Sequence, residues 1–77
     1  MAKRALITDG SKIRETRERA GLNQSQFAAI CGITQPALSR IENDQRNASP
    51  QLLRTIAGQL GVSLDAITHP VPEPVPA

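Results

Sequence analysis

The fold of this chain is decided by residues 22–43, which read Leu-Asn-Gln-Ser-Gln-Phe-Ala-Ala-Ile-Cys-Gly-Ile-Thr-Gln-Pro-Ala-Leu-Ser-Arg-Ile-Glu-Asn. The segment is typical of two short helices separated by a tight turn at Gly32, because glycine readily ends a helix in a left-handed conformation. The second helix carries polar side chains on the face that its apolar residues leave free. Each helix also has a start signal of its own.

The first of the two helices has the clearer start signal. Asn23 is a good N-cap, and Gln26 lies three residues later, where its side chain reaches back to complete a capping box. Leu22 before the cap and Phe27 within the helix form a hydrophobic staple. The residues predicted to continue inward are Ala28, Ile30 and Cys31.

The second helix has Thr34 as its N-cap and Pro36 in its first turn, where the missing N–H costs no hydrogen bond. Leu38 and Ile41 lie three residues apart and are predicted to point inward. This arrangement leaves a row of outward side chains. The row consists of Gln35, Pro36, Ser39 and Arg40.

Further helices flank this pair on both sides. A first helix is predicted over residues 10–20, capped by Asp9 or Ser11. A fourth begins after the N-cap Ser49, and a last short helix begins after Ser63. The pattern predicts an all-α fold, a compact five-helix domain with no strand.

The predicted domain covers residues 10–68. A basic arm over residues 1–9 precedes it. The tail over residues 69–77 alternates proline with other residues, so it cannot be helical and is predicted to be extended and mobile.

Composition narrows the class of protein. The 77 residues make one small domain, and its core must be aliphatic because Phe27 is the only aromatic residue. A single Cys31 and the lack of a Cys/His cluster predict no disulfide, no metal and a cytoplasmic location. No apolar run is long enough for a signal peptide or a membrane span. Because the sequence has neither a nucleophile–base pair nor a phosphate-binding glycine loop, we expect no enzyme and no cofactor.

The net charge of +2 is too small to indicate nucleic acid by itself. A helix pair of this size with glycine in its turn, however, is the arrangement that lays its second helix in the major groove of DNA. The outward row is therefore expected to contact DNA rather than serve only as a solvated face. The basic residues crowd the first twenty positions and recur later, at Lys3, Arg4, Lys12, Arg14, Arg17, Arg19, Arg40, Arg46 and Arg54.

The motif Gly-Leu-Asn-Gln-Ser-Gln-Phe-Ala, followed by Gly-Ile-Thr-Gln-Pro-Ala-Leu-Ser-Arg-Ile-Glu-Asn, resembles the helix-turn-helix of the Cro/phage-repressor family, also called xenobiotic-response-element-type regulators. The resemblance covers residues 11–67 and implies a lambda-repressor-like DNA-binding domain whose second and third helices form the helix-turn-helix. The chain departs from the family in its recognition helix, where Arg40 is the only outward basic residue and Pro36 is bulky and rigid. The base sequence therefore cannot be inferred by analogy.

The resemblance also implies roles for single residues. Gln24 is expected to touch a phosphate and to brace Gln35, whose amide would read a base edge, adenine being its natural partner. Pro36 would meet a thymine methyl group, and Arg40 would pair with guanine. The implied base contacts are Gln35, Pro36, Ser39 and Arg40, and the implied backbone contacts are Asn23, Gln24, Asn43 and Arg46.

A charge pair is implied between Arg17 in the first helix and Glu42 at the end of the third. We expect it to fasten the two helices together rather than to bind DNA. Removing one partner of a buried pair costs about 3–5 kcal/mol, a large part of a small domain's stability.

These expectations predict a sequence-specific double-stranded DNA-binding regulator of transcription, in particular a repressor. One recognition helix reads only a few base pairs, so specificity requires a homodimer on an inverted repeat with half-sites about 34 Å apart. Two alternatives are an antitoxin that also binds a toxin partner, and a protein-interaction adaptor of the same fold; no membrane partner is expected. The candidate dimer surface is apolar and consists of Leu60, Val62, Leu64 and Ile67.

Some residues allow two interpretations. Lys3 and Arg4 form either an arm along a DNA groove or a frayed basic terminus. Cys31 is predicted to be a small buried hydrophobe rather than a redox sensor, and His69 a surface residue. The proline-rich tail is either a spacer, which we favour, or an arm for a partner.

Overall fold

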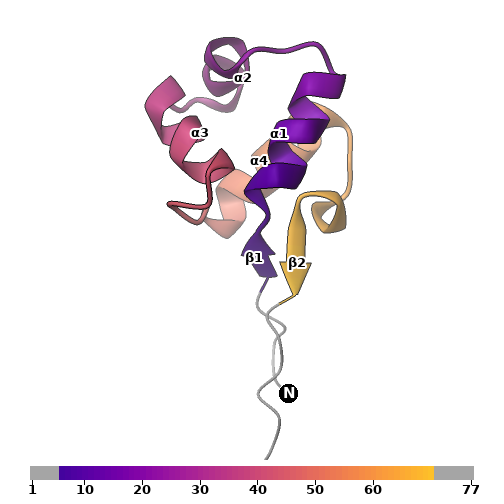
Figure 1. Ribbon diagram of the computed structural model, residues 1–77. Coiled ribbons are helices and arrows are strands. Elements are labelled where there is room, and N and C mark those ends of the chain that lie inside the picture. The colour runs from indigo at the N-terminus through magenta and orange to yellow at the C-terminus, as the bar shows by residue number, and fades with distance from the viewer. Residues whose placement is uncertain (1–5, 71–77) are drawn as a thin grey trace, which may run out of the picture.

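Four α-helices and one 3-10 turn surround a shared core, with a short two-stranded sheet at one end (Figure 1). The computed structural model describes residues 6–70. The predicted compact helical domain is confirmed, but it has four α-helices, and the predicted fifth helix is a single 3-10 turn. In chain order the elements are β1 (Leu6–Thr8), α1 (Gly10–Arg19), α2 (Gln24–Cys31), α3 (Gln35–Glu42), α4 (Pro50–Leu60), η1 (Leu64–Ala66) and β2 (Thr68–Pro70).

The helix starts are held by the caps that the sequence predicts. The side chains of Asp9, Thr34 and Ser49 each accept a hydrogen bond from the backbone N–H three residues later. At α2 both halves of the Asn23–Gln26 capping box are present. These bonds satisfy N–H groups that have no partner within the helix. The local sequence therefore determines where each helix begins.

The prediction of a fold without strands was wrong. β1 and β2 pair antiparallel, with Ile7 opposite His69, and the Asp9 backbone N–H donates to the Ile67 carbonyl at 2.9 Å beyond the last pair. Strands of three residues are too short to show the alternation by which strands are recognised in a sequence. The sequence-based boundaries place residues 6–8 in the basic arm and residues 69–70 in the tail, whereas the structure places them in the sheet. Lys3 and Arg4 of the arm lie outside the described residues, and so do residues 71–77 of the tail.

The core is aliphatic around one aromatic ring, as the composition predicts. Its buried members are Ile13, Phe27, Ala28, Leu38, Ile41, Ala48, Leu53, Ile56, Ala57 and Ile67.

Two apolar positions differ from the sequence-based expectation. Ile67 was placed on the candidate dimer surface, but its side chain is fully buried, because the turn after η1 directs it into the core. Ile30 was expected to face inward and is instead 46% exposed. It lies two residues after the buried Ala28, about 200° around the helix.

The end of α3 lies directly against the start of α1. A Cβ atom at Gly10 would lie 2.5 Å from the carbonyl oxygen of Ile41, and closer still to that of Glu42. The Gly10 backbone N–H donates to Asp44 Oδ1 at 2.9 Å. Asp44 holds a left-handed φ of 57° to make this contact. The loop after α3 is thereby fixed to α1.

Candidate nucleic-acid interface

The outer face of α3 carries the row of side chains that the sequence predicts. Gln35, Pro36 and Arg40 are exposed and Ser39 is half-buried, whereas Leu38 and Ile41 are buried on the opposite face. The predicted backbone-contact residues are also accessible. Asn23, Asn43 and Arg46 are exposed, and Gln24 is half-buried.

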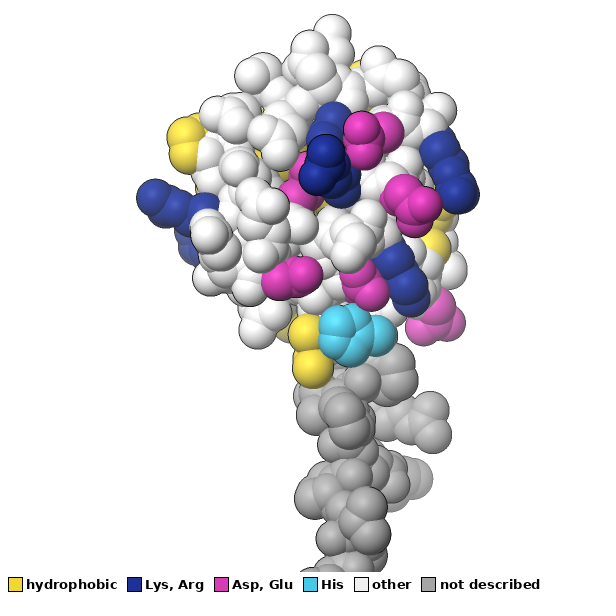
Figure 2. All heavy atoms as spheres, in the orientation of Figure 1, with side chains coloured by type: hydrophobic (Ala, Val, Ile, Leu, Met, Phe, Trp, Pro, Cys, Tyr) yellow, Lys and Arg dark blue, Asp and Glu magenta, His cyan; other side chains and the backbone are white. Residues whose placement is uncertain are grey.

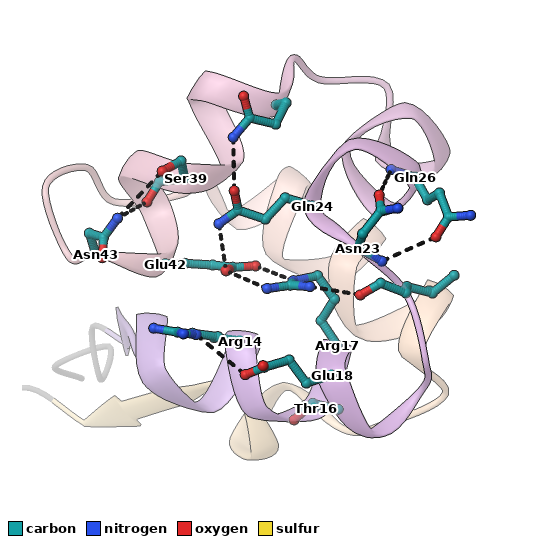
Figure 3. Close-up of polar contacts among 12 residues, drawn as sticks. Arg14, Thr16, Arg17, Glu18, Asn23, Gln24, Gln26, Ser39, Glu42 and Asn43 are labelled. Carbon is teal, nitrogen blue, oxygen red and sulfur yellow. Dashed lines mark hydrogen bonds and ion pairs between the residues drawn. The ribbon is translucent and has the colours of Figure 1, made fainter.

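A chain of hydrogen bonds links the N-termini of α2 and α3 to the ion pair behind them (Figure 3). Gln35 Nε2 donates to Gln24 Oε1 at 2.8 Å, which confirms the expected bracing of Gln35 by Gln24. Gln24 Nε2 in turn donates to Glu42 Oε1 at 3.0 Å. The first side chain of the recognition helix is therefore held by a contact that ends in a buried carboxylate.

The expected ion pair between Arg17 and Glu42 is present and doubly bonded. Arg17 Nε donates to Glu42 Oε2 at 2.7 Å, and Arg17 Nη2 donates to Glu42 Oε1 at 3.1 Å. The two side chains are only 8% and 1% exposed. A third donor, Arg17 Nη1, reaches the carbonyl oxygen of Leu22 at 2.7 Å, so the guanidinium also fixes the chain just before α2.

The hydrogen bond to Glu42 raises the pKa of Arg17 above its usual value, although burial acts in the opposite direction. Because both side chains are almost fully buried, neither can reach a phosphate or a base. The geometry thus favours the structural role of the pair.

A second contact links α3 to the loop that follows it. Asn43 Nδ2 donates to the carbonyl oxygen of Ser39 at 2.9 Å and lies 3.4 Å from Ser39 Oγ. Asn23 uses its Oδ1 atom to accept from the Gln26 backbone N–H. Of these two side-chain amides, Asn43 Oδ1 and Asn23 Nδ2 are thus the atoms left for other partners.

The structure separates paired from unpaired basic residues. Within α1, Arg14 pairs with Glu18 at 3.3 Å, and Arg19 lies 3.8 Å from Glu15. Acidic and basic side chains are accordingly interspersed over the face shown in Figure 2. Arg40 and Arg46 are exposed and form no ion pair with another residue of the described part. Unpaired arginines therefore lie on α3 and the loop after it, whereas all three arginines of α1 are ion-paired.

Sequence reasoning missed two residues that position this face. Gly10 permits the close packing of α1 against α3, and Asp44 holds the loop that contains Asn43 and Arg46. The sequence gives only an indirect signal for Asp44, since Asp tolerates the left-handed conformation better than most residues do. Apart from the glycine itself, nothing in the sequence indicates the close approach at Gly10.

The remaining reactive side chains do not form a chemical site. Cys31 is half-buried against the core, and its burial raises the pKa of the thiol. His69 Nδ1 lies 3.3 Å from Asp9 Oδ2 at the junction of β2 and α1. Among residues 6–70 no group of three His, Cys, Asp or Glu side chains is placed to hold a metal ion. Nor does this part of the chain contain a helix with the length and apolar character needed to cross a bilayer.

Comparison with known proteins agrees with this geometry. A family model described as helix-turn-helix matches residues 13–67. The chain is 36% identical over 59 residues to the propionyl-CoA carboxylase regulator of Cereibacter sphaeroides, which corresponds to 77% of this chain and 13% of that protein. It is 34% identical over 61 residues to the immunity repressor protein of Bacillus phage phi105, or 79% of this chain and 42% of the repressor. The chain thus spans less than half the length of these relatives.

A similar solved structure is that of SinR, the master regulator for biofilm formation, in complex with DNA. The two chains superpose with a TM-score of 0.68 and 32% sequence identity, covering 73% of this chain and 90% of SinR. On the family match, the relatives and the shared fold, the chain belongs to the Cro/phage-repressor-like, xenobiotic-response-element type family of helix-turn-helix DNA-binding transcription regulators.

Proposed function

We propose that this protein is a sequence-specific double-stranded DNA-binding repressor that acts as a homodimer on an inverted-repeat operator. The observation that carries the proposal is the accessible row on α3, whose first member is held in place by Gln24. The similarity to a phage immunity repressor and to a regulator solved with DNA supports it. In this proposal the protein is cytoplasmic and has neither catalytic activity nor a cofactor.

The base contacts are assigned to Gln35, Pro36, Ser39 and Arg40. The Gln35 amide can pair with one donor and one acceptor on the edge of adenine. The Arg40 guanidinium can pair with two acceptors on the edge of guanine. Pro36 offers an apolar surface to a thymine methyl group. Ser39 supplies a hydroxyl that can donate to several bases.

The backbone contacts are assigned to Asn23, Gln24, Asn43 and Arg46. These residues flank α3 on two sides, at the start of α2 and in the loop after α3. Contacts of this kind fix the register of the protein on the duplex and supply affinity without reading sequence.

The dimer contact is assigned to Leu60, Val62 and Leu64. All three are half-buried and pack against the edge of the core, so each retains accessible apolar surface. A two-fold pair of recognition helices would bind half-sites about 34 Å apart, one turn of DNA.

Selection of bound duplexes from a random library at moderate salt tests this proposal. The wild-type protein is compared with the Gln35→Ala, Arg40→Ala double variant and with Arg19→Ala, which removes an exposed arginine on α1. We expect enrichment of an inverted repeat by the wild type and by Arg19→Ala, and its loss in the double variant. Failure of every protein to enrich a sequence would contradict the proposal and favour a protein-interaction adaptor of the same fold.

A further inference from the structure

We infer that the buried carboxylate of Glu42 determines which way Gln35 presents its amide to a base. Glu42 would thus be a positioning residue for sequence specificity, although it cannot itself reach DNA. The inference rests on the proposed function, since it concerns the base contact assigned to Gln35. It is carried by the hydrogen bonds that run from Arg17 through Glu42 and Gln24 to Gln35 (Figure 3).

The direction of the chain is set at its buried end. The Glu42 side chain is 1% exposed, and Arg17 donates to both of its oxygens, which fixes its orientation. As the acidic member of this ion pair, the carboxylate accepts hydrogen bonds and has none to donate. Gln24, which lies 3.0 Å from Glu42 Oε1, must therefore face it with its NH₂ group.

The constraint then passes to α3. With its NH₂ group turned toward Glu42, Gln24 presents its carbonyl oxygen to Gln35. Gln35 must donate to that oxygen, because two amide oxygens at 2.8 Å would repel each other. One N–H of Gln35 is thus used, and its second N–H and its carbonyl oxygen remain for an outside partner.

This outward pair of groups matches one base better than the others. Adenine presents N7 as an acceptor and the N6 amino group as a donor in the major groove, and an amide that offers one N–H and one oxygen complements both. If the Gln35 amide were reversed, its two N–H groups would face the base and would suit the acceptors O6 and N7 of guanine instead. Glu42 therefore favours adenine over guanine from a position outside the interface.

The test compares binding of two duplexes that differ at the base pair whose preference depends on Gln35, one with adenine and one with guanine. The proteins are the wild type, Glu42→Gln, Gln24→Ala and the double variant, with Gln59→Ala as an exposed glutamine control on α4. A good bidentate contact discriminates between bases by about tenfold or more. We expect Glu42→Gln and Gln24→Ala each to lose about tenfold of the adenine preference, and Gln59→Ala to retain it.

The double variant distinguishes the hydrogen-bond chain from general damage. If Glu42 acts through Gln24, adding Glu42→Gln to Gln24→Ala changes the preference no further. A further loss in the double variant, or an unchanged preference in folded Glu42→Gln, would overturn the inference.

A measurement on the free protein separates this inference from the proposed function, and it holds even if Glu42→Gln fails to fold. Hydrogen exchange of side-chain amides by NMR should show one protected N–H on Gln24 and one on Gln35 in the wild type. In Gln24→Ala, which leaves the Arg17–Glu42 pair intact, the protection at Gln35 should disappear. Rapid exchange at both residues of the wild type would refute the hydrogen-bond chain whether or not the protein binds DNA.

Discussion

Arg17 and Glu42 show how one residue pair serves both the fold and the face that α3 presents. Their charges are removed from water, so each depends on the other and on the hydrogen bonds around it. The pair joins α1 to α3, and the third donor of Arg17 holds the carbonyl oxygen of Leu22.

Replacing Arg17 should therefore lower stability before it affects any binding contact. We expect Arg17→Ala to reduce the free energy of unfolding by about 3–5 kcal/mol, because Glu42 is left buried without its partner. Arg14→Ala removes an exposed pair with Glu18 and should change stability by at most about 1 kcal/mol. Urea titration followed by circular dichroism measures both. An Arg17→Ala protein of normal stability that had lost only DNA affinity would show that the pair belongs to the interface.

At the residue scale, the sequence predicted those contacts that depend on neighbours along the chain or on a known motif. The Asn23–Gln26 capping box, the Gln24–Gln35 contact and the Arg17–Glu42 pair all agree with the structure. The burial of Ile67 and the exposure of Ile30 did not follow, because side-chain direction near a helix end depends on how the elements pack.

At the scale of elements, the junction of α1 with α3 sets the position of the recognition helix. Gly10 lets the two backbones approach closely, and Asp44 ties the loop after α3 to the first turn of α1. The sequence predicted the limits of these helices from their caps but not this junction. A close approach between backbones distant in sequence leaves only a glycine as its signal.

Two glycine substitutions test the junction against a matched site. Gly10→Ala should destabilise the protein, because the added methyl group meets backbone carbonyl oxygens that cannot move aside as a side chain would. Gly58→Ala lies within α4 and meets nothing within 4 Å, so it should stabilise the protein by about 0.5–1 kcal/mol. Thermal unfolding of the two variants gives the comparison. Equal shifts of the same sign in the melting temperatures of the two variants would disprove the close packing at Gly10.

Asp9 connects α1 with β2 and should make stability depend on pH. Burial tends to raise the pKa of its carboxyl group, but the hydrogen bond from the Lys12 N–H and the contact with His69 outweigh it, so the pKa lies below 3.8. A lowered pKa means that the folded state favours the ionised form. The resulting stabilisation is present above the unfolded pKa and is lost as the pH falls through the folded pKa.

Urea unfolding between about pH 2 and 7 should thus show an acid-dependent loss of stability that Asp9→Asn reduces. Asp65→Asn, at an exposed position in η1, provides the control and should keep the loss. An identical pH profile for wild type and Asp9→Asn would show that Asp9 is not coupled to folding.

At the scale of the whole molecule, the proposed DNA binding depends both on the distribution of charge and on the shape of the exposed face. The net charge of +2 is small, and the basic residues of α1 are largely paired, which leaves Arg40 and Arg46 beside the recognition face. The sequence predicted the face itself from the amphipathic pattern of α3. Apart from Arg17, it did not predict which basic residues are neutralised within the fold, because ion pairing depends on rotamers and on tertiary contacts.

Arg40 and Arg46, which lie beside the recognition face, should differ in their effects on the selected operator. Arg40→Ala should cost about 1–3 kcal/mol and relax the preference at one base pair. Arg46→Ala should weaken binding to all sequences alike. It should also make the slope of the logarithm of the binding constant against the logarithm of the salt concentration shallower by about 0.9. Fluorescence anisotropy on matched and mismatched duplexes at several salt concentrations gives both quantities. If Arg40→Ala lost affinity equally on every sequence, Arg40 would be a backbone contact.

The measurement that tests the proposed interface most directly is NMR mapping of the isotope-labelled protein with a duplex recovered by selection. If α3 binds in the groove, the largest changes in amide chemical shift should fall on the first turn of α2, along α3 and in residues 43–46. Residues of β1, β2 and the outer face of α1 should change little. Changes concentrated on those outer elements, with α3 unaffected, would contradict recognition of DNA by this face.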